Sequence, residues 1–300
     1  MTDPTLVAEP VKPASLRRTV VTRRNFLRLA AGSAAGLAFY SGEIARHEIE
    51  IVNRTITLSR LPDAFAGLRI VQISDFHFEE FSEAFFLETM VRKVNALAPD
   101  LVVLTGDFVS RGPLPRRIAA KMSYHCAEIL SRLTCPLRYA ILGNHDCMVN
   151  SRAVTDALVT HSLPVLANRC VPLERDGQRI WLAGIEDVLE QRPDLTAALP
   201  ALRNPDREPV ILLVHEPDFA DLAVRRQVPL ILSGHTHGGQ VRIPLLPPIH
   251  LPEMGTLYVE GFFRLSDHTQ LYVNRGIGTV GVPFRLRCPP EITVITLAQG

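Results

Sequence analysis

The sequence Leu230-Ile231-Leu232-Ser233-Gly234-His235-Thr236-His237 joins a short apolar run directly to two histidines. Such a run is typical of a buried strand, and residues two apart on an extended chain point to the same side. Four other apolar runs end similarly: Ile70–Ser74 before Asp75 and His77, Leu101–Thr105 before Gly106 and Asp107, Tyr139–Leu142 before Gly143-Asn144-His145-Asp146, and Val210–Val214 before His215. Five strands that end in polar side chains can present them along one edge, which predicts a two-metal site.

The residue types in these blocks restrict the metal. Carboxylate and amide oxygens combined with several imidazoles suit Mn²⁺, Zn²⁺ or Fe better than Ca²⁺ or Mg²⁺. No thiolate lies among the candidate ligands. The glycines Gly106 and Gly143 allow a tight turn next to a strand end.

Strands and helices are expected to alternate through the first half of the chain. Apolar spacing predicts helices over Ser82–Leu97, Ile118–Leu133 and Ala153–His161. Further strands are expected over Glu48–Leu58, Arg179–Gly184, Leu257–Val259, Leu271–Val273 and Ile292–Leu297, and a loop over Ile243–Pro252. This order is typical of βαβ units with buried parallel strands, so residues 47–300 are predicted to form one layered α/β domain.

Residues 1–46 differ from this domain. They hold seven Lys or Arg against three Asp or Glu, and Thr22-Arg23-Arg24-Asn25-Phe26-Leu27-Arg28 is followed by a short Ala, Gly and Leu stretch. The pattern resembles a twin-arginine export signal, which implies the twin-arginine translocation machinery as a partner. The expected location is periplasmic or at the inner membrane. Cleavage near Ser41–Ala45 and retention as an anchor both remain open.

Charge and cysteine content exclude some classes. The net charge of +1 gives no electrostatic reason to expect nucleic acid as a partner. The five cysteines contain no C-x-x-C pair, and their odd number argues against a complete disulfide framework.

The five blocks together resemble the signature of calcineurin-like metallophosphoesterases, over roughly residues 67–298. The segments Ser233–Pro244, Asn274–Gly278 and Cys288–Ile292 are similar to exported or membrane-associated bacterial phosphodiesterases of this family. The resemblance implies a four-layer α/β/β/α sandwich that binds two divalent metal ions.

The resemblance also implies roles for single residues. Asp75, His77 and His237 would hold one metal ion, Asn144, His215 and His235 the other, and Asp107 would bridge them. A water bound between the ions would attack phosphorus, and His145 would donate a proton to the leaving oxygen. Arg111 could steady a substrate phosphate.

One block departs from the protein phosphatases of this family, which carry Gly-Asp-x-Val-Asp-Arg-Gly. This chain has Ser110 in place of the second aspartate, which orients the proton-donating histidine in those enzymes. The departure argues against protein phosphatase activity. Asp146 or a backbone group is left to orient His145.

Two functions follow as hypotheses. The first is a metal-dependent hydrolase of phosphodiester or pyrophosphate bonds, on a small-molecule or lipid substrate such as a phospholipid or a UDP-diacylglucosamine-like glycolipid of lipid A synthesis. The second is a non-catalytic metal-binding protein of the cell envelope. The phenylalanines from Phe76 to Phe86 are either core residues or an apolar wall beside the site, and the loop Ile243–Pro252 is either a second wall, a membrane contact, or covered.

Overall fold

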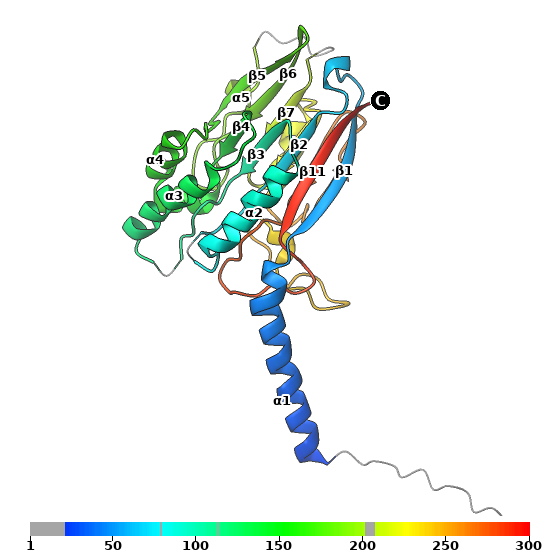
Figure 1. Cartoon of the computed structure of the whole chain (residues 1–300). Coiled ribbons are helices and arrows are strands. Elements are labelled where there is room, and N and C mark those ends of the chain that lie inside the picture. Colours follow the sequence, from blue (N-terminus) through cyan, green and yellow to red (C-terminus); the bar gives the residue numbers. More distant parts are fainter. Residues whose placement is uncertain (1–21, 79, 113, 202–207) are drawn as a thin grey trace, which may run out of the picture. The chain divides into compact units, whose positions relative to one another are not determined.

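The computed structural model describes residues 22–78, 80–112, 114–201 and 208–300 (Figure 1). Contacts divide the chain into two units, one ending at Ala38 and the other running from Phe39 to Gly300. The predicted boundary after residue 46 remains a prediction, and residues 1–21 of that segment lie outside the described part.

The segment before the first strand is helical. It comprises α1 (Arg23–Phe39), a π-helical turn (Tyr40–Ile44) and a 3-10 turn (Ala45–His47). Among the described residues, the helices are all too short or too polar to cross a bilayer.

Two mixed sheets form the centre of the second unit. The first has the spatial order β1-β11-β2-β3-β4, in which only the β11–β2 pair is antiparallel. Its strands are β1 (Glu50–Leu58), β2 (Arg69–Ile73), β3 (Leu101–Thr105), β4 (Arg138–Ile141) and β11 (Glu291–Gln299). Figure 1 shows the blue β1 directly beside the red β11.

The second sheet has the order β5-β6-β7-β8-β10-β9, with parallel pairs in its middle and an antiparallel pair at each end. Its strands are β5 (Arg169–Arg175), β6 (Gln178–Gly184), β7 (Val210–Leu213), β8 (Leu230–Ser233), β9 (Gly261–Arg264) and β10 (Gln270–Val273).

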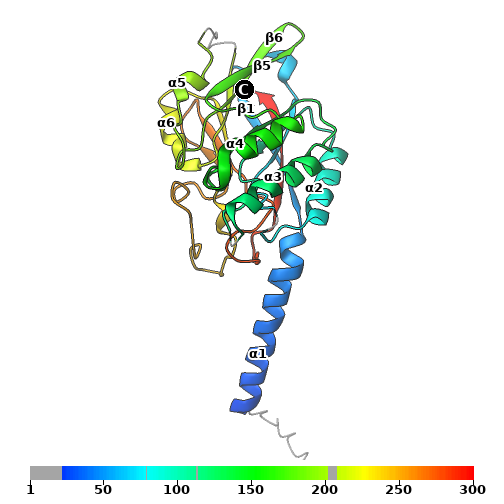
Figure 2. The same ribbon diagram turned by 90° about the vertical axis from the view of Figure 1, so that its left-hand side faces the viewer.

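Helices cover the outer face of each sheet. The first sheet carries α2 (Ala84–Ala96), α3 (Arg116–Leu130) and α4 (Asn144–Thr160), and the second carries α5 (Leu195–Ala198), the 3-10 turn Pro217–Phe219 and α6 (Ala220–Val224). Figure 2 shows α6 on the opposite side of the body from α2.

Alternation along the buried strands fills three apolar layers. In β2, Val71 belongs to the layer under α2–α4, whereas Ile70 belongs to the layer between the sheets. In β7, Ile211 joins that central layer and Leu212 joins the layer under α5 and α6. The predicted four-layer α/β/β/α sandwich is therefore confirmed.

One predicted strand was wrong, and one strand was missed. Leu257–Val259 is not a strand, because the N–H groups of Leu257 and Tyr258 donate to the Asp218 carboxylate instead of a neighbouring strand. The strand in this region is β9, and β5 was not predicted at all.

Helix α4 begins nine residues before the predicted start at Ala153. It is interrupted at Asn150, which has φ −179° and ψ 96°, and whose side chain accepts a hydrogen bond from the N–H of Ala153. The predicted helix is thus the second part of α4. The first part begins at Asn144, within one of the ligand blocks.

Candidate metal centre

Five loops at the carboxyl ends of strands bring the candidate ligands together. The first sheet contributes Asp75, His77, Asp107 and Asn144, and the second contributes His215, His235 and His237. All seven side chains are at most 7% exposed. The cluster therefore exists only where the ends of both sheets meet.

The first group contains Asp75, His77 and His237, whose ligand atoms lie within 4.8 Å of one another. The Nε2 atoms of His77 and His237 are 2.9 Å apart. His237 Nε2 is also 3.4 Å from Oδ1 of Asp75. Two imidazole nitrogens and a carboxylate oxygen thus converge on one point.

The second group contains Asp107, His215 and His235, again with ligand atoms within 4.8 Å. Oδ2 of Asp107 lies 3.3 Å from Nε2 of His215 and 3.5 Å from Nε2 of His77. This oxygen atom, a member of the second group, therefore also lies next to His77 of the first group, which is the arrangement that a bridging ligand requires.

Three imidazoles are oriented by a hydrogen bond through their other ring nitrogen. Nδ1 of His77 contacts Oγ of Ser110 at 2.6 Å, and Nδ1 of His215 contacts the carbonyl of Thr105 at 2.7 Å. Nε2 of His235 contacts the carbonyl of Glu253 at 2.8 Å. Donation of N–H to these acceptors leaves the facing nitrogen with a free lone pair, as metal-binding histidines require.

Two buried polar atoms point to a bound cation. Nε2 of His215 and Oδ1 of Asn144 have no hydrogen-bond partner among the described residues. Buried polar atoms are rarely left unsatisfied without a ligand or a cost in stability. Their position beside Asp107, together with the oxygen and imidazole donor set, fits a pair of divalent ions such as Mn²⁺, Zn²⁺ or Fe.

Burial shifts the pKa values of these groups. It lowers the pKa of His77 and of His235 to about 3, so both rings are neutral and able to bind metal at pH 7. Burial, together with the nearby Asp107, raises the pKa of Asp75 to about 6. The pKa of His215 is raised despite burial, because Asp107 and Asp75 face it.

The backbone of the site adopts sparsely populated conformations. Asp75, His77, Asp107, His235 and His237 have φ values between 45° and 73°, in the left-handed region. Non-glycine residues seldom adopt this region, although Asp, Asn and His do so more often than the others, and such conformations are concentrated at functional sites. The loop after β2 thereby directs Asp75 and His77 inward, the loop after β3 directs Asp107, and the loop after β8 directs His235 and His237.

Close approach of the loops requires glycine. A Cβ at Gly143 would lie 2.3 Å from Oδ1 of Asp107 and 2.7 Å from Nε2 of His215. A Cβ at Gly106 would lie 2.7 Å from both the N atom of Gly143 and Nδ1 of His215. These two positions have no room for a side chain.

His145 lies beside this cluster, with its ring 4.8 Å from the ring of His77. Its ring Nδ1 accepts a hydrogen bond of 3.0 Å from the backbone N–H of Arg111. The backbone N–H of His145 donates to Oδ1 of Asp107. The sequence left either Asp146 or a backbone group to orient His145, and the structure shows that the backbone N–H of Arg111 orients its ring. Asp146 instead accepts from the N–H groups of Phe108, Val109 and Gly143.

Ser110 and Arg111 follow Asp107 in the same block. Ser110 contacts His77 and not His145. The Arg111 guanidinium lies 3.6 Å from Sδ of Met148, and Arg111 is not among the residues that line the adjoining cavity. Its contact with a substrate phosphate remains a prediction.

Arg285 is a structural residue of the site that the sequence did not indicate. Its side chain is fully buried and donates to the carbonyls of Arg275, Gly276, Gly278 and Cys288, and it lies 3.5 Å from Nδ1 of His237. It thereby holds the loop after β10 against the His237 loop. An arginine between apolar neighbours in Phe284-Arg285-Leu286 gives no sequence signal of burial.

A cavity of about 580 Å³ opens beside the cluster. Its polar end is formed by Asp107, Asn144, His145, His235 and His237. Its apolar wall is formed by Val241, Ile249, Pro252, Val280, Val282 and Phe284. The phenylalanines from Phe76 to Phe86 do not line it, and Phe76, Phe78 and Phe86 are core residues.

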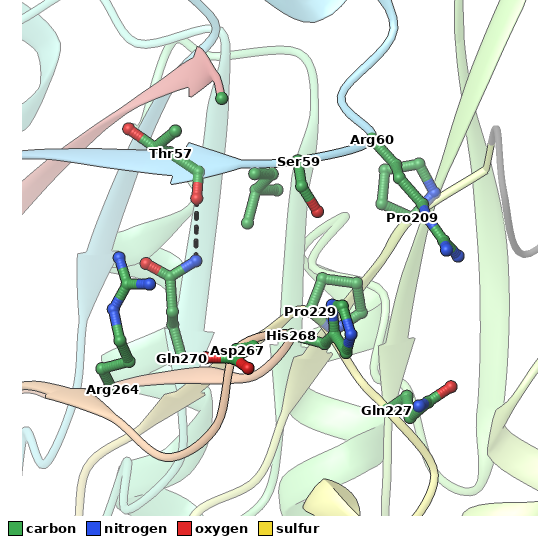
Figure 3. Close-up of a pocket in the computed structure, with 12 residues that line it drawn as sticks. Thr57, Ser59, Arg60, Pro209, Gln227, Pro229, Arg264, Asp267, His268 and Gln270 are labelled. Carbon is green, nitrogen blue, oxygen red and sulfur yellow. Dashed lines mark hydrogen bonds between the residues drawn. The ribbon is translucent and has the colours of Figure 1, made fainter.

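A second cavity, of about 280 Å³, lies at the opposite ends of the strands (Figure 3). It adjoins the end of β1 and the residues Pro209 and Pro229, which precede β7 and β8. The side chain of Gln270 donates to the carbonyl of Thr57 beside it. It is therefore separate from the ligand cluster.

The profile of the family described as "Calcineurin-like phosphoesterase" matches residues 68–239, the segment that carries all seven candidate ligands and His145. The chain belongs to this family. It is therefore a metallophosphoesterase, and a family that uses two metal ions accounts for the two ligand groups around Asp107.

Similar proteins occur in bacteria and animals. The uncharacterized metallophosphoesterase YkuE of Bacillus subtilis is 37% identical over 92% of this chain and 98% of its own length. A Danio rerio protein named "Transmembrane protein with metallophosphoesterase domain" is 33% identical over 97% of this chain, which spans 65% of that protein. Phosphodiesterase YaeI of Escherichia coli is 26% identical over 93% of this chain and 100% of its length.

A methyl group at Gly143 is expected to disrupt the centre. Because the added Cβ would lie 2.3 Å from the Asp107 carboxylate, Gly143→Ala should weaken Mn²⁺ binding by at least about tenfold, measured by calorimetry. Gly36→Ala is the control, because a Cβ there contacts nothing within 4 Å. Equal Mn²⁺ affinity in both variants would contradict the role of Gly143.

Asp75→Asn should stabilise the metal-free protein in a pH-dependent manner. The pKa of Asp75 is about 6 in the folded chain against 3.8 in the unfolded chain, so the ionised carboxylate opposes folding above pH 6 and not below pH 4. The variant should gain up to about 3 kcal/mol in free energy of unfolding at pH 8, and nothing near pH 4. Urea unfolding in EDTA measures this difference.

The same variant should lose the stabilisation that Mn²⁺ gives to the native chain. Exposed Asp156→Asn serves as the control and should behave as the native chain in both experiments. A gain at pH 8 that persists undiminished at pH 4 would show that ionisation of Asp75 is not its cause.

Proposed function

We propose that this phosphoesterase hydrolyses phosphodiester or pyrophosphate bonds at the metal centre. The single observation that carries the proposal is the Asp107 oxygen shared by two ligand groups at the polar end of a cavity. The E. coli relative named as a phosphodiesterase supports a diester substrate. The loss of the second aspartate at Ser110 argues against a protein phosphatase.

The seven ligands would be divided between two metal ions. Asp75, His77 and His237 would hold one ion, Asn144, His215 and His235 the other, with Asp107 between them. Two bound divalent ions supply an acidic water and neutralise charge on the phosphoryl oxygens. Burial keeps the His77 and His235 rings neutral, and Ser110, Thr105 and Glu253 fix the orientation of His77, His215 and His235 in turn.

His145 would deliver a proton to the leaving oxygen. Its Nδ1 is occupied as an acceptor by the N–H of Arg111, so the neutral ring carries its proton on Nε2. The residue lines the cavity and is only partly buried, unlike the ligands. It therefore faces the cavity without belonging to the seven ligands, so its ring is free to contact a bound substrate.

The apolar wall supports a substrate that carries a lipid. Val241, Ile249, Val280, Val282 and Phe284 provide a surface that an acyl chain could contact while the phosphate lies at the polar end. A phospholipid and a UDP-diacylglucosamine-like glycolipid both have this form. The export signal favours the first, because nucleotide-linked lipid intermediates are made on the cytoplasmic side.

The sequence around Arg23 and Arg24 supports a location outside the cytoplasm. Export by the twin-arginine route would place the protein in the periplasm or at the inner membrane, with a membrane surface as a partner. The animal relative named as a transmembrane protein supports an association of this domain with membranes.

His145→Ala is the sharpest test of the chemistry. With Mn²⁺ bound, the variant should turn over a chromogenic phosphodiester about 10²–10⁴-fold more slowly in kcat, because it lacks the proton donor. The exposed His268→Ala should match the native enzyme. Unchanged turnover by His145→Ala would refute its role as the acid.

The same assay distinguishes the function classes. Native enzyme with two Mn²⁺ per chain should cleave the diester faster than the corresponding monoester, and a long-chain acylated diester with a lower KM than a short-chain one. No turnover of any ester with metal bound would favour the non-catalytic metal-binding protein. Equal KM for both chain lengths would exclude the lipid role of the wall.

Replacing both arginines of the signal tests the location. The Arg23→Lys/Arg24→Lys variant should accumulate in the cytoplasmic fraction, because the twin-arginine route depends on the paired arginines. Arg17→Lys/Arg18→Lys is the matched control and should be exported. An unchanged periplasmic fraction of the first variant would exclude the route.

A further inference from the structure

An exposed apolar loop surrounds one side of the cavity opening. Ile243, Leu245, Leu246 and Ile249 are between 42% and 104% exposed, with Leu245 the most exposed. The loop from Ile243 to Pro252 contains no acidic residue and no Lys or Arg. Four large aliphatic side chains in seven residues exceed what a soluble surface normally displays in one place.

The loop is continuous with the cavity. Ile249 lines the cavity and is 65% exposed, and Val282, on the loop after β10, lines the same cavity and is 46% exposed. We call Ile243, Leu245, Leu246, Ile249 and Val282 the apolar rim. An apolar path therefore leads from solvent to the wall beside His145.

The segment that follows α1 is built into this same side of the body. The carbonyl of Ser41 accepts a hydrogen bond of 3.0 Å from the N–H of Arg285, and a Cβ at Gly42 would lie 3.0 Å from the ring of Phe284. Phe284 is part of the apolar wall. The turn Tyr40–Ile44 thus packs directly on the cavity wall next to the rim.

Further contacts fix this segment to the body. The Arg46 guanidinium pairs with Glu83 at 2.5 Å, and the ring of His47 lies 5.0 Å from that of Phe86. Ser41 and Ala45 are buried. Cleavage within Ser41–Ala45 would remove packed residues, so the geometry favours retention of the N-terminal segment over cleavage there.

We propose that the apolar rim docks onto a phospholipid bilayer, so that the cavity opens toward lipid. The benefit of such docking rests on the proposed function, but the binding of the rim to lipid does not require catalysis. A bilayer fits better than a protein partner, because the rim is an irregular proline-rich loop with separate protruding side chains. Insertion of such side chains at the headgroup boundary is how proteins lie on a membrane surface.

The test compares two double variants of the full chain. L245S/L246S removes two rim side chains that do not line the cavity, and V159S/L222S removes two exposed aliphatic side chains on α4 and α6. Binding to vesicles of phosphatidylethanolamine and phosphatidylglycerol is measured by sedimentation. Both variants keep α1, so any difference between them reports the rim.

We expect L245S/L246S to bind the vesicles about tenfold or more weakly, and V159S/L222S to bind as the native chain does. A tryptophan probe locates the contact: fluorescence of the L246W variant should be quenched by brominated lipid more than that of L222W, over the shared background of Trp181. Equal binding by the two double variants, or equal quenching, would overturn the proposal.

Turnover separates this proposal from the proposed function. L245S/L246S should retain the native kcat/KM on a soluble phosphodiester, because neither side chain lines the cavity. Rim-dependent vesicle binding without turnover of any phosphoester would support docking while the proposed function failed. A native dimer that becomes a monomer in L245S/L246S, without vesicle binding by the native chain, would show that a second copy covers the rim.

Discussion

The whole site depends on one carboxylate oxygen, Oδ2 of Asp107, which lies between the imidazoles of His77 and His215. Asp107 and His77 come from the first sheet and His215 from the second. The interaction is therefore possible only when the two sheets stack with their ligand-bearing ends together. The central apolar layer, which includes Ile70 of β2 and Ile211 of β7, packs the two sheets against each other in this relative position.

This arrangement opposes stability and serves chemistry. Five ligand residues adopt left-handed backbone conformations, each at a cost on the order of 1 kcal/mol or more. Burial places carboxylates close together and leaves Asn144 and His215 with unsatisfied atoms. A cation pair would neutralise the carboxylates and satisfy these atoms, and so offset the backbone cost, and folding and metal loading are therefore expected to be strongly coupled in this chain.

The ligands of the site could be predicted from the sequence, but the residues that orient and pack against them could not. Polar residues at strand ends are visible in one dimension, so the ligands and His145 could be named, and the long apolar strands predicted the sheets. The contacts of Ser110 with His77 and of Arg111 N–H with His145 depend on loop conformation and have no local signal. The burial of Arg285 depends on how its own loop folds, because the carbonyls that it contacts belong to Arg275, Gly276, Gly278 and Cys288. Leu257 is not in a strand because Asp218, which is distant in sequence, accepts its N–H.

The placement of β11 has a consequence for synthesis. β11 lies between β1 and β2, with nine residue pairs along β1, although β2 ends at Ile73 and β11 begins at Glu291 (Figure 1). The ribosome must therefore deliver Glu291–Gln299 before β1 can join its sheet. Until then β1 has no strand to pair with, and its two buried side chains, Ile56 and Leu58, lack the core around them. Assembly of this edge of the sheet is therefore expected to follow translation of the last strand.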